Sequence, residues 1–510
     1  MEATSSERVA KNTGFLFIRM LLILGVGLFT SREILRILGV TDFGIYNLVG
    51  TLVTMFVFFQ MALNNATSRF ITFDLGAGNL TNLQKTFSMS MNTELVVFGI
   101  ILVLSEAVGP WFIAHKLQIP EGRMFAAQMV FQISLFNFLF GLIFIPYRSI
   151  IIAHEKMSFY SYTSIAEAIF KLLSVYFLLI ISFDKLIFYA LFQMGVSVVM
   201  FFWYLYYSKK HFEEARYTLY WDGKLLKKIV SYSGLSLLLN VADIAVGQSI
   251  SIFFNMFQGV VANAALGVAN TVNNYIGNFL NNFTTSYNPQ IIKSYAAKQY
   301  DYFMKLIYSS SKMSFFLFFA VAFPIILNIN EILQLWLANP PAQTGTFVVF
   351  IVAYGLFDSF SWPLMHAVHA TGNLKVHQPL MASIKILNIP ISYLLLKNGA
   401  PSYIILVVYA ALNLVCAIVR IIYLHFLIHL DLYKYFKEVL FKMILISCIS
   451  VPIPMLIAFS NDNKLMTLFS TTAVFLAIYS VCVYFLGLNK REKEIMGDML
   501  CKAKSKIIRR

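Results

Sequence analysis

The sequence predicts an all-α integral membrane protein with about fourteen transmembrane helices. Hydrophobic residues make up 59% of its 510 residues and charged residues only 12%, whereas a soluble domain carries about 25% charged residues. Apolar runs of about 20 residues, the length that crosses a bilayer core, recur along the whole chain. Helices fit these runs because they pair every backbone polar group within the segment, and the alternation typical of a membrane β-barrel is absent from the sequence.

The apolar runs place the individual spans. We expect them at residues 13–31, 43–66, 86–109, 125–147, 159–182, 185–207, 229–256, 260–285, 303–327, 347–368, 380–397, 401–428, 440–459 and 466–488. The turns at 183–184 and 257–259 are very short, which leaves open whether the helices that flank them are merged or shifted.

The distribution of basic residues gives the orientation. The connecting segments on the side of the N-terminus, with the span ends that border them, carry 27 Lys and Arg, and those on the other side carry 7. The positive-inside rule therefore places both termini in the cytoplasm. The formal net charge of +15 does not indicate nucleic-acid binding, because the charges lie in short loops between apolar runs.

An internal repeat indicates how the spans are grouped. Segment 39–74 aligns without gaps on segment 259–294, where Gly39, Val40, Thr51 and Ile71 meet identical residues and the polar faces coincide. An even number of spans separates the two copies, so both run in the same direction. This predicts two pseudo-symmetric six-helix bundles around a central cavity, and parallel repeats of this kind are one way to build an alternating-access transporter.

The predicted organisation has five parts. They are an N-terminal six-helix bundle at 1–207, a cytoplasmic linker between the bundles at 208–228, a C-terminal six-helix bundle at 229–428, two additional transmembrane helices at 429–488 and a basic cytoplasmic tail at 489–510. The tail carries eight Lys and Arg. Each basic residue near an anionic leaflet contributes about 1 kcal/mol of binding, so we expect the tail to bind anionic membrane lipids.

Polar residues form a stripe on one face of the predicted span 260–285. They follow one another about one turn apart and are Asn270, Asn274, Asn278 and Asn281. The preceding span has a similar face that includes Asn240 and Asp243. We interpret the stripe as the lining of a water-filled cavity, and hydrogen bonding between packed helices is the alternative.

Charged side chains inside spans are functional candidates because their burial is costly. The cations are Arg19, Lys171, Lys312, Lys385 and Arg420. Four of the five lie in the predicted cytoplasmic half of their span, which would suit an anionic headgroup that arrives from the cytoplasm. Snorkelling to the interface is the alternative, and we favour it for Lys385. Lys171 follows Glu167 by one turn, so a structural ion pair is an equal alternative there.

Three intramembrane acids are candidates for a coupling proton or Na⁺. They are Glu94, Asp243 and Asp358. Each could instead pair with one of the cations, and Asp243 is the best coupling candidate because it lies on a polar face. The four cysteines show neither a disulfide framework nor metal-ligand spacing, so we predict no metal and no cofactor.

The N-terminal region carries a recognisable pattern. The stretch RVAKNTGFLFIRMLLILGVGLFTSREILRILGVTDFGIYNLVG at 8–50, followed by ALNNATSRFITFDLGAGN at 62–79, resembles the start of Wzx-type polysaccharide transporters. The pattern consists of a basic residue with Asn-Thr before the first span, LGxxDFGxY leading into the second, and SRF after it. The rest of the chain is similar to that family in helix count, repeat layout and loop lengths.

The resemblance implies a V-shaped two-bundle flippase in a bacterial inner membrane. Such proteins move undecaprenyl-diphosphate-linked oligosaccharide repeat units from the cytoplasmic to the periplasmic leaflet, for lipopolysaccharide O-antigen or another surface polysaccharide. On that pattern Arg19 is the leading candidate to contact the diphosphate, and Arg69 of the SRF motif is the second. Polysaccharide polymerase and chain-length proteins are candidate partners.

Three other functions compete with this prediction. The nearest is a cation-coupled multidrug exporter of the same superfamily, whose cationic substrates favour an acidic, aromatic cavity. A membrane-embedded polymerase, ligase or glycosyltransferase is disfavoured, because the sequence has only short connections and no visible acid–base or metal spacing. A scaffold within an assembly complex would not need a polar stripe. We therefore predict a transporter and not an enzyme.

Overall fold

The structure is a computed structural model in which every regular element is helical. It describes residues 19–116, 119–337, 343–460, 464–490 and 492–494, apart from positions 21, 24, 28, 31, 32, 35, 40, 41, 44, 47, 51, 54 and 55. No strand occurs among these residues, which confirms the predicted all-α class. Thr51 of the repeat, most of the tail at 489–510 and part of the first two predicted spans lie outside the described residues.

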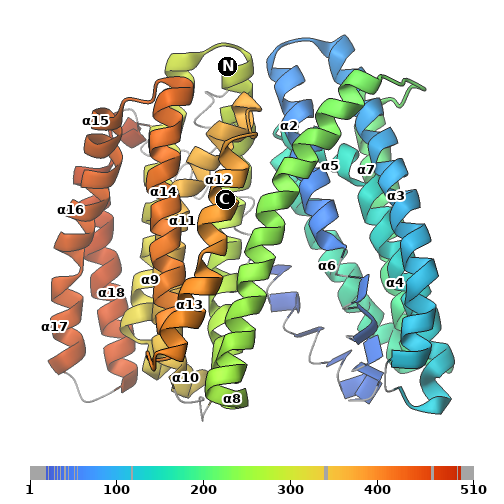
Figure 1. The fold of residues 1–510 in the computed structure, drawn as a ribbon, viewed down its shortest axis with the longest axis horizontal. Helices are drawn as coiled ribbons and strands as arrows, with labels where there is room; N and C mark the ends of the chain where they lie inside the picture. Colours follow the sequence, from blue (N-terminus) through green and yellow to red (C-terminus); the bar gives the residue numbers. More distant parts are fainter. Residues whose placement is uncertain are drawn as a thin grey trace, which may run out of the picture. The chain divides into compact units, whose positions relative to one another are not determined.

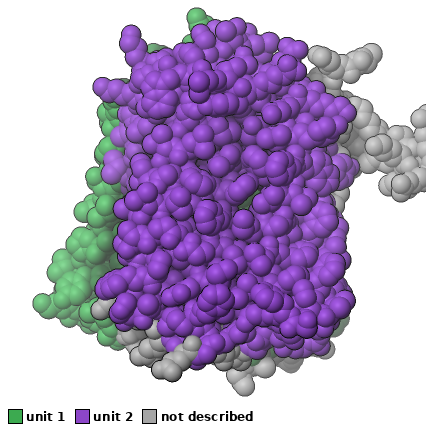
Figure 2. Space-filling view, turned by 90° about the vertical axis from the view of Figure 1, so that its right-hand side faces the viewer, with its two compact units in different colours: residues 1–13, 241–294, 298–510 green, residues 14–240, 295–297 purple. Residues whose placement is uncertain are grey.

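The chain forms two compact units, which Figure 2 shows in different colours. Unit 2 contains the described residues from 19 to 240 together with 295–297, and unit 1 contains 241–294 and the described residues from 298 onward. The division predicted at the linker 208–228 stays a prediction.

The helices of unit 2 follow the predicted spans (Figure 1). Its elements are α2 (Val57–Gly76), α3 (Leu80–Lys116), η1 (Glu121–Arg123), α4 (Met124–Ile143), α5 (Ile145–Ala153), α6 (Met157–Ile180), α7 (Lys185–His211), η2 (Glu213–Ala215) and the beginning of α8 (Gly223–Ala296). The described residues between 19 and 50 are helical as well.

Unit 1 contains the rest of α8 and all later elements. They are α9 (Tyr300–Leu327), α10 (Ile329–Leu337), α11 (Thr344–Thr371), α12 (His377–Ile386), α13 (Asn388–Lys397), α14 (Ile404–Ile428), α15 (Leu432–Tyr435), η3 (Phe436–Leu440), α16 (Phe441–Ser450), α17 (Pro452–Ser460), α18 (Lys464–Cys482) and η4 (Val483–Gly487).

Eleven helices of the described residues are long and apolar enough to cross a membrane. They coincide with eleven of the fourteen predicted spans. The other three are the first two, where positions are left out, and 260–285, which forms the second half of α8. At 1.5 Å per residue, the 74 residues of α8 would extend about 110 Å, far more than a bilayer core of about 30 Å. Helix α8 is therefore long enough to include both predicted spans, 229–256 and 260–285.

Three predicted spans are split into two helices each. The breaks fall at Phe144 before Pro146, at Leu387 before Pro390 and at Val451 before Pro452. A proline inside a helix lacks the N–H that would bond four residues back, and its ring clashes with that carbonyl, so the helix kinks there. The split does not end the crossing, because the next helix continues in the same apolar run.

The ends of the helices reproduce the predicted internal repeat. Helix α2 ends at Gly76 and α8 ends at Ala296, while α3 begins at Leu80 and α9 begins at Tyr300. The two members of each pair are separated in sequence by the same offset as the aligned segments 39–74 and 259–294.

The turns after these helices match as well. Gly78 and Lys298, which the same alignment pairs, both have left-handed backbone with φ of 73° and 57°. The next residue in each turn donates its N–H to the carbonyl five positions earlier, from Asn79 at 3.3 Å and from Gln299 at 2.9 Å. This is the helix-ending geometry that favours glycine, and Lys298 adopts it without one. The repeat therefore extends beyond residues 74 and 294.

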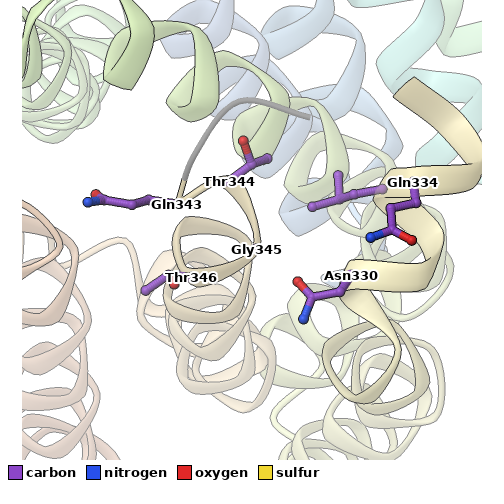
Figure 3. Close-up of a pocket in the computed structure, with 7 residues that line it drawn as sticks. Asn330, Gln334, Gln343, Thr344, Gly345 and Thr346 are labelled. Carbon is purple, nitrogen blue, oxygen red and sulfur yellow. The ribbon is translucent and has the colours of Figure 1, made fainter. Parts of the chain in front are cut away.

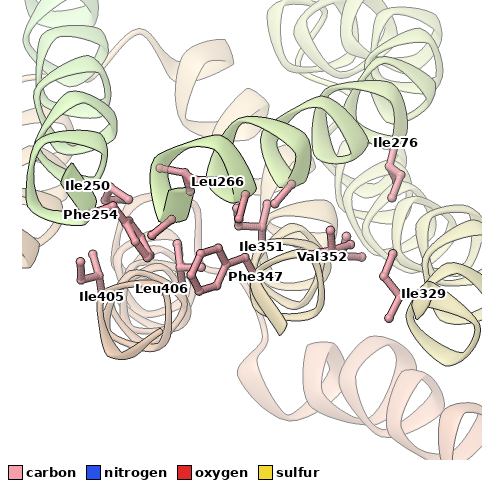
Figure 4. Close-up of a cluster of buried hydrophobic side chains, with 14 of the residues drawn as sticks. Ile250, Phe254, Leu266, Ile276, Ile329, Phe347, Ile351, Val352, Ile405 and Leu406 are labelled. Atoms are coloured by element: carbon pink, nitrogen blue, oxygen red, sulfur yellow. The ribbon is translucent and has the colours of Figure 1, made fainter. Parts of the chain in front are cut away.

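Equivalent helices pack in the same way in each unit. In unit 2, α4 packs against α3 and α7, and α6 packs against α7. In unit 1, α11 packs against α9 and α14, and α12 and α13 pack against α14. Figure 4 shows the apolar core of unit 1, where Phe254 of α8 meets Phe347 of α11 with ring centroids 4.7 Å apart. These pairings confirm that both units are built on one plan.

One arginine joins three loops at one end of unit 2. The Nε of Arg123 donates to Asp42 at 2.8 Å, and its Nη1 donates to Asp184 at 2.5 Å. Asp184 also caps α7 by accepting the backbone N–H groups of Leu186 and Ile187. All three loops were predicted on the side opposite the termini. This contact therefore agrees with the predicted alternation of the spans across the membrane.

The linker contacts the opposite end of unit 2. His154 Nε2 lies 2.6 Å from the carboxylate of Glu214, and its ring stacks on Phe212 at 4.1 Å. The linker hydroxyl of Thr218 lies 3.1 Å from that of Ser88 in α3. These loops were all predicted on the side of the termini, and their placement in the cytoplasm stays a prediction.

We predict that Arg123→Gln lowers the thermal stability of the purified protein by roughly 1 kcal/mol, the scale of partly exposed ion pairs. Burial raises the pKa of Asp184, but the hydrogen bonds from Arg123 and from the N–H groups of Ile187 and Leu186 outweigh it and hold the pKa below its ordinary value of 3.8. A lowered carboxyl pKa contributes stability above the unfolded-state pKa and loses it as the pH falls through the folded-state pKa.

The difference in melting temperature between wild type and Arg123→Gln should therefore be full at neutral pH and shrink below about pH 4. Arg36→Gln is the control, because Arg36 is exposed and Glu33, three positions earlier, is its ion-pair partner among the described residues. An equal loss in both variants, or a difference that grows in acid, would contradict this role of Arg123.

Candidate functional site

A buried lysine and a partly exposed aspartate form an ion pair within unit 1. The ammonium of Lys385 in α12 donates to Asp243 in α8 at 2.6 Å, and the Lys385 side chain is only 9% exposed. Our expectation that Lys385 snorkels to the interface is therefore wrong. The reason is that Asp243 offers a countercharge inside the unit.

The second acid of this region is Asp358 in α11. It accepts a hydrogen bond from Tyr354 Oη at 3.0 Å, and the ring of Tyr354 lies 4.6 Å from that of Tyr409 in α14. Asp358 interacts electrostatically with both Lys385 and Arg420. It is therefore close enough to both cations of the cluster to interact with each of them.

Arg420 in α14 is buried and bound to acceptors of its own unit. Its Nε donates to His377 Nε2 at 3.2 Å, and its Nη1 donates to the carbonyl of Ser361 at 3.3 Å and to the hydroxyl of the same residue. A histidine that accepts at Nε2 carries its proton at Nδ1, so this contact fixes the tautomer of His377. The guanidinium is thereby fixed between α11 and α12.

These residues form a charge-balanced cluster across four helices. Asp243 and Asp358 provide two negative charges, and Lys385 and Arg420 provide two positive ones. A buried charge without a countercharge is costly, and removing one partner leaves the other uncompensated. The two coupling-ion candidates of unit 1 are thus compensated by cations of the chain itself.

The polar stripe of α8 lies on an exposed face. All four of its members, Asn270, Asn274, Asn278 and Asn281, are exposed, whereas Ala269, Ile276 and Leu280 beside them are buried. The stripe is therefore not packed into the core of unit 1. Asn240, on the earlier part of α8, is half-buried, and its amide nitrogen has no hydrogen-bond partner among the described residues.

The arginines of unit 2 lie against aromatic rings. Arg19 is half-buried, with its guanidinium carbon 4.7 Å from the ring centroid of Tyr160 and its Nη2 3.5 Å from the hydroxyl of Tyr160. Arg69 is buried between Phe70 and Phe73, at 4.7 and 4.6 Å, with Tyr232 at 5.8 Å. Cation–π contacts of this kind hold a desolvated guanidinium in place.

The other two intramembrane lysines, Lys171 and Lys312, also form ion pairs. Lys171 donates to Glu167 at 2.6 Å, as the structural alternative predicted, and both side chains remain partly exposed. Lys312 is fully buried and donates to Glu492 at 2.8 Å. Glu492 also accepts from Ser309 at 2.6 Å, so the beginning of the tail is bound to α9.

Glu94 in α3 has no basic partner among the described residues. Its side chain is fully buried and accepts a hydrogen bond from Thr67 of α2 at 3.0 Å. Of the three coupling-ion candidates, Glu94 is thus the one that interacts with no basic side chain in the described part of the chain.

The sequence reasoning missed several members of these clusters. Tyr354 and Asp358 are four residues apart, a spacing that places both on one helix face and that could have indicated the pair. His377 and Ser361 carry no such signal, because their link to Arg420 spans three helices. Glu492 was counted with the tail, and nothing local in the sequence indicates its contact with Lys312.

A separate pocket of about 320 Å³ lies between α10 and the start of α11 (Figure 3). Its lining is polar but uncharged and consists of Asn330, Leu333, Gln334, Gln343, Thr344, Gly345 and Thr346. It contains neither a cation for an anionic headgroup nor an acid for a coupling ion, so it does not belong to the candidate site. Within the described residues, no group of three or more His, Cys, Asp or Glu could hold a metal ion.

No protein-family model and no curated protein matches the sequence. Solved structures do match. A crystal structure of a MATE mutant gives a TM-score of 0.73 at 13% identity, covering 84% of this chain and 99% of that one. The fold is that of MATE transporters. An outward-facing multidrug resistance MATE family transporter of the MOP superfamily gives a TM-score of 0.71 at 14% identity, over 84% and 98% of the two chains.

A third solved structure of the MATE fold is a MOP superfamily transporter from Pyrococcus furiosus Vc1 (DSM3638), described by a reverse polarity of its binding pocket that suggests a different function. It gives a TM-score of 0.69 at 13% identity, over 84% of this chain and 99% of that one. At these identities the likeness concerns the fold. It confirms the predicted all-α, multi-helix membrane fold class.

We predict that Lys385→Met destabilises the protein and that Asp243→Asn added to it restores most of the loss. Breaking a buried ion pair costs about 3–5 kcal/mol, and the 39% exposure of the Asp243 side chain reduces this to roughly 1–3 kcal/mol. Thermal unfolding of the two single variants and the double variant measures the coupling. Additive losses would show that Lys385 and Asp243 do not compensate each other.

Proposed function

We propose that this protein is a flippase for undecaprenyl-diphosphate-linked oligosaccharides in a bacterial inner membrane, with both termini in the cytoplasm. It would move repeat units from the cytoplasmic to the periplasmic leaflet by alternating access, for O-antigen or another surface polysaccharide. Anionic lipids would bind its basic tail, and polysaccharide polymerase and chain-length proteins are the partners that such a cargo requires next.

The observation that carries the proposal is the exposed asparagine stripe in α8. Unpaired amide groups cost several kcal/mol in hydrocarbon, so four exposed asparagines at membrane depth favour contact with water over contact with lipid. An asparagine side chain both donates and accepts hydrogen bonds. A hydrated row of such groups suits the hydroxyl groups of a sugar chain and offers little to an apolar drug.

The diphosphate is the difficult part of the cargo. The polyprenyl tail can remain in lipid, whereas a charge at the bilayer centre costs from about 3 to over 10 kcal/mol. A half-buried arginine held by an aromatic ring, as Arg19 is by Tyr160, can offer a fixed positive charge to the diphosphate. Arg69 is more deeply buried among its rings, which favours Arg19 as the first contact.

The alternative is a cation-coupled multidrug exporter, and the fold of the solved multidrug transporter supports it. A cationic drug needs an acid without a countercharge. In unit 1 the acids Asp243 and Asp358 face Lys385 and Arg420, which disfavours such a site. The Pyrococcus transporter described by reverse pocket polarity is a precedent within this fold for a function other than drug export.

We predict that Arg19→Ala abolishes surface display of the cognate polysaccharide in the native host while the protein stays in the membrane at normal amount. The loss follows from removing the positive charge that receives the diphosphate. Gel analysis of the surface glycan and immunoblotting of membranes measure both quantities. Arg36→Ala serves as the control, because this cation is exposed and has Glu33 as its ion-pair partner in the described part of the chain.

Unchanged surface glycan in Arg19→Ala would remove Arg19 from the mechanism. Protection of the host against cationic drugs by the wild-type protein, with no effect on the glycan when the gene is deleted, would favour the exporter.

A further inference from the structure

Glu94 lies in an environment unlike that of the other acids inside the helices. It is fully buried in α3. One carboxyl oxygen, Oε1, accepts from Thr67 Oγ1 of α2 at 3.0 Å. The other, Oε2, is buried and has no hydrogen-bond partner among the described residues. Oε2 is therefore shielded from water, and no hydrogen bond among the described residues replaces the water it has lost.

The acids of the other helices have countercharges or lie at the surface. Asp243, Glu167 and Glu492 each contact a lysine, and Glu106, further along α3, is exposed and bonded to Gln132. For Glu94, Thr67 is the one side chain among the described residues that contributes an interaction.

The charged groups of the elements packed around α3 do not pair with Glu94 in the described part of the chain. On α2, Arg69 lies among aromatic rings and Asp74 accepts from Thr86. On α5, Arg148 interacts with Tyr204, and in η2 Glu214 pairs with His154. Helix α4 contains no charged residue. No charged side chain among the described residues therefore compensates an ionised Glu94.

An ionised carboxyl group in this position is unfavourable. An isolated charge in the bilayer core is strongly unfavourable, and a protonated carboxyl avoids that cost. A metal cation would need several oxygen ligands around it, and Thr67 is the one oxygen partner that the described residues offer. The packing of α2 against α3 thus favours a neutral acid.

We propose that Glu94 is a proton-binding site of unit 2. One proton binds per carboxylate and neutralises it while α2 and α3 are packed as described, and the same proton leaves when water reaches the carboxyl. By linkage, a group that binds its proton in one conformation stabilises that conformation as the pH falls. A proton is therefore the ion linked to movement of α2 against α3, whatever cargo the protein carries.

Infrared difference spectroscopy of the full-length protein in lipid nanodiscs tests the proposal without a cargo. In wild type we expect a carbonyl stretching band of a protonated carboxyl that loses intensity as the pH is raised and that is absent in Glu94→Gln. Absence of a Glu94-dependent band at every pH would mean a carboxylate that never takes up a proton. A band that stays unchanged at every pH would mean a proton that never leaves. Either result overturns the proposal.

A second measurement follows the conformational change. Glutamine is isosteric with the protonated acid and keeps an acceptor for Thr67, so Glu94→Gln should fix the neutral form. Hydrogen exchange of α2 and α3, corrected for intrinsic rates, should depend on pH in wild type and be nearly independent of pH in Glu94→Gln. Glu106→Gln, on the same helix but exposed, should behave like wild type. Equal pH profiles in wild type and Glu94→Gln would show a merely structural acid.

Thr67→Val keeps the carboxyl in case Glu94→Gln does not fold. Loss of its hydrogen bond should shift the frequency of the carboxyl band and keep its dependence on pH. A band that does not respond to this change would not belong to Glu94. Failure of these tests leaves the cargo assignment untouched, because surface-glycan display is measured separately with Arg19→Ala.

Discussion

The cost of a polar group in hydrocarbon is the constraint on which the rest of this structure depends. It makes the apolar spans helical, because a helix pairs its own backbone. It also brings each buried lysine to an acid, as with Lys385 and Asp243 or Lys312 and Glu492. Where no such partner exists, the same cost carries functional information. From this cost we infer that water hydrates the exposed asparagines of α8 and that a proton neutralises the buried carboxyl group of Glu94. Both functional inferences are thus applications of one rule.

Most of the fold could be predicted from the sequence, because hydropathy reports the span of a helix directly. The repeat that relates segments 39–74 and 259–294 was predicted from few identities. The left-handed turns at Gly78 and Lys298 show that the backbone conformation repeats as well. One detail escaped the prediction. The splits before Pro146, Pro390 and Pro452 lie inside apolar runs, so hydropathy does not show them. The predicted spans 229–256 and 260–285 share one helix, α8, an alternative that the very short turn at 257–259 left open.

The candidate site was predictable only where partners are close in sequence. Lys171 and Glu167 are one turn apart, and local spacing was enough. Lys385 and Asp243 are separated by 142 residues, so their pairing depends on how α8 and α12 pack. The distance of Lys385 from its helix end suggested snorkelling, but a nearby carboxylate decided the outcome. The aromatic rings around Arg69 likewise come from two helices, and their effect depends on tertiary packing.

The central claim is that the asparagine stripe of α8 faces water at membrane depth. It is tested most directly by replacing the four native cysteines and introducing single cysteines as Asn274→Cys, Asn278→Cys and, on the same helix, Ile252→Cys. All three positions are exposed in the structure. In native membranes, a polar maleimide should label the two asparagine positions and leave position 252 unlabelled, because thiols react readily only in water. Unreactive cysteines at 274 and 278, or equal labelling at all three, would contradict a hydrated stripe and with it the account of transport.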